Sequence, residues 1–75
     1  MTPNPENHHF QKRSVSLHGH KTSVSLEKAF WDVLQEAAHI QNISLSHLIK
    51  NIDETRKGNL ASALRVYALG WVVAK

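Results

Sequence analysis

The fold is decided by one stretch of sequence, His20-Lys21-Thr22-Ser23-Val24-Ser25-Leu26-Glu27-Lys28-Ala29-Phe30-Trp31. In its first half the side chains alternate, with Thr22, Val24 and Leu26 on one side and Lys21, Ser23 and Ser25 on the other. A period of two residues is typical of a half-buried strand. From Glu27 onward the apolar side chains follow the period of a helix instead. The stretch therefore predicts a strand that runs directly into a helix and carries a cation and two hydroxyls on its polar side.

Composition limits the chain to one small domain of 75 residues with a net charge of +3 and no cysteine. A chain of this size buries only about 60% of its unfolded surface, and no disulfide can supplement its core. Packing against a second copy is the expected supplement. Residues 1–26 contain three cationic side chains, Lys12, Arg13 and Lys21, but only one carboxylate, Glu6. This local excess of cations is consistent with two interpretations, ordinary solubility or a ribbon that faces a polyanion.

The N-terminal part divides into an arm and a second strand. Residues 1–11 lack periodicity, so we expect a flexible arm, with the folded domain over residues 12–75. Alternation over about 13–18 predicts a strand. Gly19 separates it from the strand over about 21–26, either as the tight turn of a hairpin or as a kink in one bent strand. Alternation on both sides of Gly19 favours the hairpin.

Three helices are expected after the strands, over about 27–41, 44–56 and 59–73. Asn42 is suited to end the first helix in the left-handed conformation, and Ser44 and Asn59 are suited to cap the next two. The fold class is therefore mainly α with a short N-terminal β-ribbon.

The last helix is apolar on most of its sides, which is unusual for the surface helix of a small monomer. A short strand also leaves an unpaired edge that favours pairing with another strand. The simplest arrangement is an intertwined homodimer in which residues 21–26 of the two copies pair as antiparallel strands. Its expected core contains Thr22, Val24, Leu26, Phe30, Leu34, Leu48, Ile52, Leu64, Tyr67 and Trp71.

Three segments carry a resemblance to a known superfamily. They are Gly19-His20-Lys21-Thr22-Ser23-Val24-Ser25-Leu26-Glu27 with Phe30-Trp31, Ile43-Ser44-Leu45-Ser46-His47-Leu48-Ile49 with Ile52-Asp53, and Asn59-Leu60-Ala61-Ser62-Ala63-Leu64-Arg65-Val66. In this order they resemble the ribbon-helix-helix superfamily of the Arc/MetJ type, and more closely a bacterial variant with a third, C-terminal helix. The resemblance covers about residues 13–69.

The resemblance implies a sequence-specific DNA-binding transcriptional regulator, a homodimer that places its β-ribbon in the major groove. By position, Lys21, Ser23 and Ser25 would contact bases, and Lys12, Arg13, Ser44, Ser46 and His47 would contact phosphates. A two-stranded ribbon fits a groove about 12 Å wide, and a helix N-terminus favours a phosphate.

The alternative is a homodimeric protein-interaction or antitoxin-like module of the same fold without direct base readout. Two hairpins joined edge to edge would form a four-stranded sheet about as wide as the groove, and serine is a short side chain for reaching bases. Both points favour this alternative.

Other classes of function find little support in the sequence. No nucleophile motif or glycine-rich phosphate loop is present, so we expect no enzyme, no cofactor and no small-molecule substrate. His18 and His20, like His8 and His9, form only pairs, whereas a metal site needs three or four converging ligands, so no metal is expected. No apolar run reaches membrane-spanning length and no leader is visible. We expect a cytoplasmic, nucleoid-associated protein.

Overall fold

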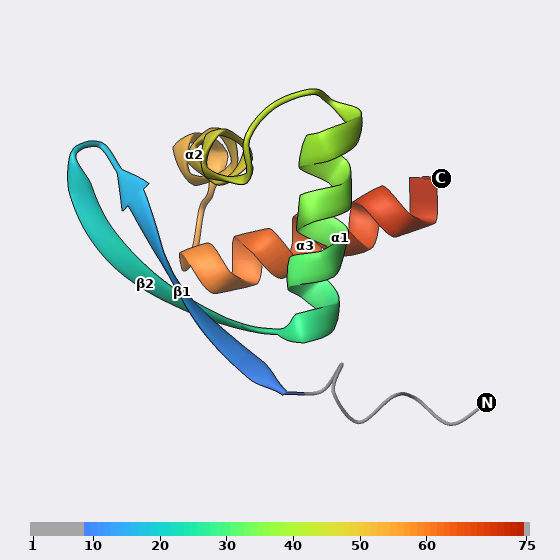
Figure 1. Cartoon of the computed structure of the whole chain (residues 1–75), viewed down its shortest axis with the longest axis horizontal. Helices are drawn as coiled ribbons and strands as arrows, with labels where there is room; N and C mark the ends of the chain where they lie inside the picture. The colour runs from blue at the N-terminus through green and yellow to red at the C-terminus, as the bar shows by residue number, and fades with distance from the viewer. Residues whose placement is uncertain (1–8, 75) are drawn as a thin grey trace.

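The computed structural model describes residues 9–74. Over this range the chain forms two strands, β1 (Phe10–Leu17) and β2 (His20–Glu27), followed by three helices, α1 (Lys28–Ile40), α2 (Leu45–Thr55) and α3 (Leu60–Ala74) (Figure 1). This arrangement confirms the predicted fold class of a short N-terminal β-ribbon followed by helices. The predicted helix ends differ from the observed ones by one residue each.

The two strands form an antiparallel hairpin, in which Val15 lies opposite Thr22. His18 and Gly19 connect them and have φ angles of 52° and 81°. Two successive positive φ angles are the mark of a type I′ turn, whose twist matches that of the flanking strands. Of the two geometries left open by the sequence, the structure therefore has the hairpin. β1 also begins at Phe10, inside the segment expected to be an arm, and residues 1–8 of that segment lie outside the described residues.

Ser44 and Asn59 cap the starts of α2 and α3, as their residue types predict. The Ser44 hydroxyl accepts a hydrogen bond from the backbone N–H of His47 at 3.0 Å, and the Asn59 side-chain oxygen accepts one from the N–H of Ser62 at 2.7 Å. Asn42, after the end of α1, has a φ of 58°. These caps satisfy groups that a helix end leaves unpaired.

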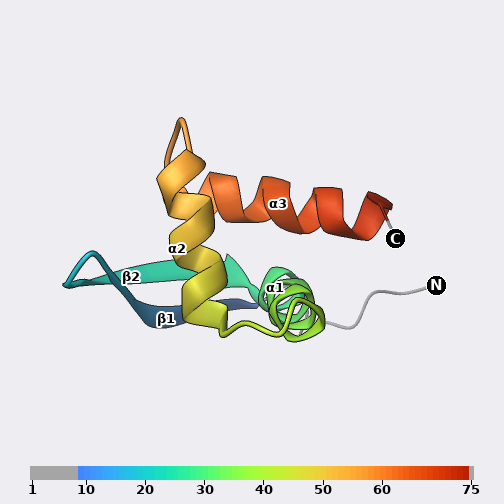
Figure 2. The ribbon, with the colours of Figure 1, turned by 90° about the horizontal axis from the view of Figure 1, so that it is seen from above.

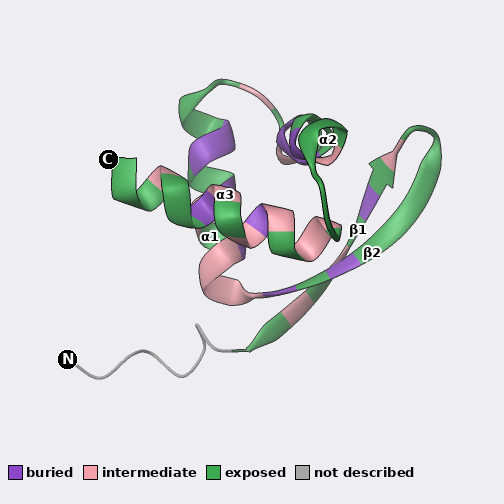
Figure 3. Ribbon diagram, turned by 180° about the vertical axis from the view of Figure 1, so that it is seen from behind, coloured by how far each residue is buried: buried purple, intermediate pink, exposed green. Residues whose placement is uncertain are grey.

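The core lies between the hairpin and the three helices, and its largest fully buried side chains are Trp31, Leu26, Leu34, Ile49 and Leu64. Figure 3 shows the buried segments on the sides of the elements that face one another. In α1 the expected core contained Phe30, and the structure buries the neighbouring Trp31 more deeply. Phe30 is only partly buried and Ile40 is 57% exposed, whereas Trp31 is fully buried.

The buried Trp31 side chain packs between α1 and β1. Its indole Nε1 donates a hydrogen bond to the backbone carbonyl of Gln11 at 2.8 Å. On the same side of the hairpin, the Arg13 guanidinium lies 5.0 Å from the centre of the indole ring, within the range of a cation–π contact. A side chain of α1 and two residues of β1 thus hold the start of the hairpin against the helices.

The helices cover one face of the hairpin. Figure 2 shows the hairpin along one side of the molecule, with α3 on the opposite side and α2 running between them. Arg65 of α3 reaches the end of β2, where its Nε and an Nη atom each donate to the same Glu27 oxygen at 3.0 Å. The opposite, outer face of the hairpin remains open to solvent.

Candidate nucleic-acid interface

The outer face of the hairpin is a strip of two lysines and four serines. The register pairs Lys12 with Ser25, Ser14 with Ser23, and Ser16 with Lys21, and all six residues are exposed. None of their side chains makes a hydrogen bond or an ion pair within residues 9–74. We call these six residues the outer strip. Its hydroxyls and ammonium groups are available to a ligand without breaking any internal contact.

The two positive charges of the outer strip lie at its opposite ends. Lys12 and Lys21 lie diagonally opposite, each across from a serine, with the pair formed by Ser14 and Ser23 between them. Alternate residues of a strand share a face, so Lys12 and Ser16 mark a length of about 13 Å along β1. The arrangement offers two cations and four hydroxyls, which can donate hydrogen bonds to a polyanion and also accept them from it.

Sequence reasoning selected Lys21, Ser23 and Ser25 for this surface, and the structure places all three on it. It did not select Ser14 and Ser16, which β1 contributes to the same face. The alternation of side chains that identified β1 could have indicated both serines, because a hairpin turn puts the polar sides of its two strands on the same face.

Arg13 lies on the other face. Its guanidinium stacks over Trp31 and one of its Nη atoms donates to the side-chain oxygen of Gln11 at 3.4 Å. The residue is partly buried beneath the hairpin. The structure therefore separates Arg13 from Lys12, although both were expected to contact phosphates.

The N-terminus of α2 lies on the hairpin side of the molecule, and its C-terminus lies on the far side (Figure 2). Ser44, Ser46 and His47 are exposed there. The Ser44 hydroxyl satisfies the N–H of His47, but a helix also leaves earlier N–H groups without intrahelical partners. This end of α2 combines free donors with the positive end of the helix dipole.

The residues expected in a dimer core lie mostly in the core of the single chain. Val24, Leu26, Leu34, Leu48, Ile52 and Leu64 are buried, while Phe30, Tyr67 and Trp71 are partly buried and packed against them. Thr22 is exposed. Whether a second copy extends this core stays a prediction.

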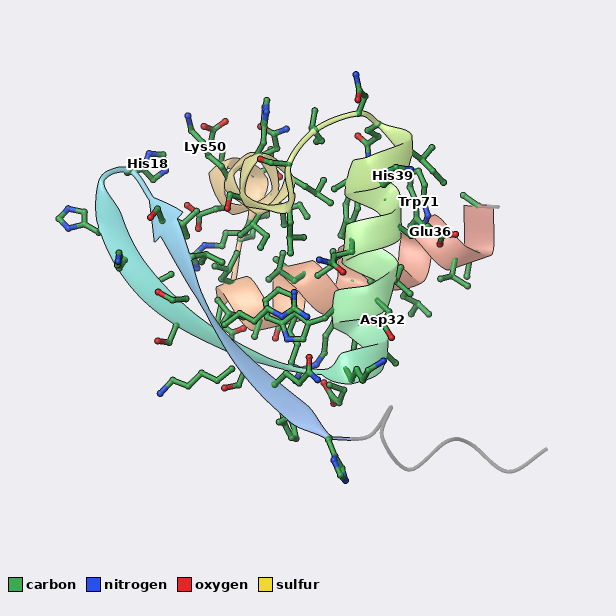
Figure 4. All side chains as sticks on the ribbon, viewed as in Figure 1. His18, Asp32, Glu36, His39, Lys50 and Trp71 are labelled. Atoms are coloured by element: carbon green, nitrogen blue, oxygen red, sulfur yellow. The ribbon has the colours of Figure 1, made fainter. Side chains whose placement is uncertain are left out.

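A histidine contact and a groove lie outside the outer strip. His18 lies at the hairpin tip (Figure 4), and its Nε2 is 3.4 Å from a carboxylate oxygen of Asp53 in α2. Residues 9–74 contain no group of three potential metal ligands. A groove of about 440 Å³ lies between the end of α2 and the start of α3. Its Arg56 contacts Asp53 and the carbonyl of Gly58, and its Asn59 caps α3, so these polar groups are engaged in holding the loop.

The family profile described as "Ribbon-helix-helix domain" matches residues 10–72, nearly all of the described chain. The chain belongs to this family.

Among solved structures, the chain is similar to an uncharacterised protein from Bordetella pertussis Tohama I. The two are 36% identical and superpose with a TM-score of 0.83, over 95% of this chain. This chain spans 62% of the length of that protein. No curated protein matches the sequence. Within the part of the chain that the structure describes, no helix has both the length and the hydropathy needed to cross a membrane.

Proposed function

We propose that this protein is a sequence-specific DNA-binding transcriptional regulator that inserts its hairpin into the major groove, with the outer strip against the bases. The observation that carries the proposal is the outer strip itself: six exposed polar side chains without internal partners within residues 9–74, on the ribbon of a ribbon-helix-helix domain. A regulator of this kind would act in the cytoplasm, associated with the nucleoid.

The chemistry of the outer strip suits base edges. Lysine donates to guanine O6 or N7, and serine hydroxyls donate or accept at either base type. We assign base contacts to Lys21, Ser23 and Ser25. The assignment is supported by their exposure on one face and by the absence of competing contacts in the described part of the chain.

Phosphate contacts would flank the ribbon. Lys12 lies at one end of the outer strip, and the start of α2, at Ser44, Ser46 and His47, could bind a phosphate through backbone N–H groups. Arg13 is left out of this set because its guanidinium lies over Trp31. Lys12 and the start of α2 would then give about four phosphate contacts in a homodimer, and a log–log slope of affinity against salt near −4.

A homodimer is part of the proposal, and two surfaces support it. β2 pairs with β1 on one edge only within the described residues, so its other edge is available to a second β2. The exposed side of α3 carries Val66, Leu69 and Val73, which are 71%, 62% and 76% exposed. We call these three residues the α3 stripe; Figure 3 shows the C-terminal half of α3 largely exposed.

The same α3 stripe favours the alternative function, a homodimeric interaction or antitoxin-like module without direct base readout. Contiguous exposed apolar side chains mark protein–protein contacts. A module of this kind would use the α3 stripe and leave the outer strip without a ligand, so the two functions differ in which surface a ligand protects.

The experiment is a titration of duplex DNA with the wild-type protein and the Lys21→Ala variant across several salt concentrations. Lys21→Ala should weaken binding and make the salt slope shallower, because it removes a cation from the interface. Lys57→Ala, which removes an exposed lysine from the loop between α2 and α3, is the matched control and should bind like the wild type. Equal affinities and slopes for all three proteins would refute the proposal.

A further inference from the structure

The two strands of the hairpin carry the same six-residue pattern. Residues 12–17 read Lys-Arg-Ser-Val-Ser-Leu and residues 21–26 read Lys-Thr-Ser-Val-Ser-Leu, identical at five of six positions. The register places Ser14 opposite Ser23. The repeats are therefore related by an approximate twofold axis that passes through this pair, perpendicular to the hairpin.

The outer strip obeys this axis at every position. Because the strands are antiparallel, the axis exchanges Lys12 with Lys21 and Ser16 with Ser25, while Ser14 and Ser23 exchange at the centre. Each residue type is thus presented twice, once on each strand, in equivalent positions.

The inner face obeys the axis only in part. Val15 and Val24 are equivalent and are 6% and 5% exposed, but Arg13 stacks over Trp31, while its counterpart Thr22 is exposed. The single difference between the repeats is therefore explained by packing against α1. No packing contact explains the identity of the polar positions, because their side chains contact nothing within residues 9–74 by hydrogen bond or ion pair.

We infer that the hairpin of one chain is a complete reading ribbon with internal twofold symmetry, and that its target is a short inverted repeat in double-stranded DNA. The inference rests on the proposed function and adds β1 to the reading surface. This moves Lys12 from the phosphate contacts of the proposed function to the bases. Lys12, Ser14 and Ser16 contact the bases of one half of the repeat as Lys21, Ser23 and Ser25 contact those of the other half.

The dimensions of a single hairpin suit this role. Two strands lie about 4.8 Å apart, and a two-stranded ribbon fits a major groove about 12 Å wide. The outer positions of each strand extend over about 13 Å, which is about four base steps at roughly 3.4 Å each. Duplex DNA has local twofold axes of its own, so a symmetric ribbon matches an inverted repeat about these axes.

The inference also fixes where two copies could join. Pairing through β2 would produce four strands, spanning about 14 Å between the outer strand axes, which exceeds the groove. One hairpin per groove therefore rules out the β2 edge, the first of the two dimer surfaces named under the proposed function, and leaves the second, the α3 stripe. A dimer joined there would carry two symmetric ribbons and would bind two such repeats.

The test compares equivalent positions on the two strands. Duplex DNA selected by the wild-type protein from a random pool is titrated with Lys12→Ala, Lys21→Ala, Ser14→Ala and Ser23→Ala, with Lys57→Ala as the control. Each lysine variant should weaken binding about tenfold, the two should agree within about twofold, and the serine pair should likewise agree. The selected sequence should be an inverted repeat. Circular dichroism verifies that each variant remains folded.

The outcomes separate this inference from the proposed function. If Lys21→Ala weakens binding and Lys12→Ala does not, β2 alone reads DNA, and the inference fails while the proposed function stands. A selected sequence without inverted symmetry would also overturn the inference. If neither lysine variant differs from Lys57→Ala, the outer strip does not bind DNA and both fail.

Discussion

Replacing Trp31 with phenylalanine should destabilise the domain far more than the same replacement at Trp71. Trp31 is fully buried and donates to the Gln11 carbonyl at 2.8 Å. Trp31→Phe leaves this partly buried carbonyl without its partner, which costs about 1–3 kcal/mol, and removes part of a packed side chain, which costs about 1 kcal/mol more. We expect a total loss of about 2–4 kcal/mol, against a stability of about 4–11 kcal/mol for a chain of this size.

Trp71 provides the matched control. Its indole Nε1 is buried without a hydrogen-bond partner within the described residues. Trp71→Phe removes a donor that already carries a desolvation cost, so the loss of packing is offset. We expect the free energy of unfolding to change by less than about 1 kcal/mol.

Urea denaturation followed by far-ultraviolet circular dichroism measures both variants without depending on tryptophan fluorescence. With a denaturant slope of about 1 kcal/mol per molar, Trp31→Phe should lower the midpoint by about 2–4 M, or leave the protein unfolded in buffer. Trp71→Phe should move it by less than about 1 M. Equal midpoint shifts in the two variants would refute the argument that the bond from Trp31 to Gln11 holds the hairpin against α1.

Three further predictions address the turn, the α2 cap and the dimer. Gly19→Ala places a Cβ at a φ of 81°, and should cost about 1 kcal/mol and lower the melting temperature by about 4–8 °C; an unchanged melting temperature would contradict the assigned turn. Ser44→Ala removes the cap on the N–H of His47, and should cost about 1 kcal/mol by the same assay, whereas Ser46→Ala, which removes no capping bond, should not. Replacing Val66 and Leu69 together by serine should leave the circular dichroism unchanged but shift sedimentation at micromolar concentration from dimer to monomer; a dimer that persists would remove the α3 stripe from the interface.

The order of elements could be predicted from local pattern. The change from a period of two to a helical period at Glu27 located the junction of β2 and α1, and the capping residues Ser44 and Asn59 located the starts of the next helices. These features depend on residues near one another in the chain, so no knowledge of the packing was needed.

The features that sequence analysis missed depend on long-range contacts. Phe30 and Trp31 are adjacent and both fit the apolar side of a helix, so periodicity alone could not decide which one is buried. The choice is made by the Gln11 carbonyl, which lies 20 residues away and accepts the indole N–H. Likewise, the position of Arg13 follows from its contact with Trp31.

The candidate site could be predicted for β2 but not for β1. Resemblance to a known family selected residues of β2 alone. The repeated Lys-x-Ser-Val-Ser-Leu pattern shows that β1 presents the same residues on the same face only once the register is known, which brings Ser14 opposite Ser23. The hairpin therefore adds three residues of β1 to the three residues of β2 in the proposed DNA-binding surface.

The central claim is that the outer strip is the surface that contacts DNA. It is tested most directly by following the backbone amide resonances of the isotopically labelled protein as the selected duplex is added. If the outer strip contacts DNA, the largest changes are expected over residues 12–16 and 21–25, with smaller ones at 44–47. Changes confined to α3, or none at concentrations that saturate the duplex, would contradict it.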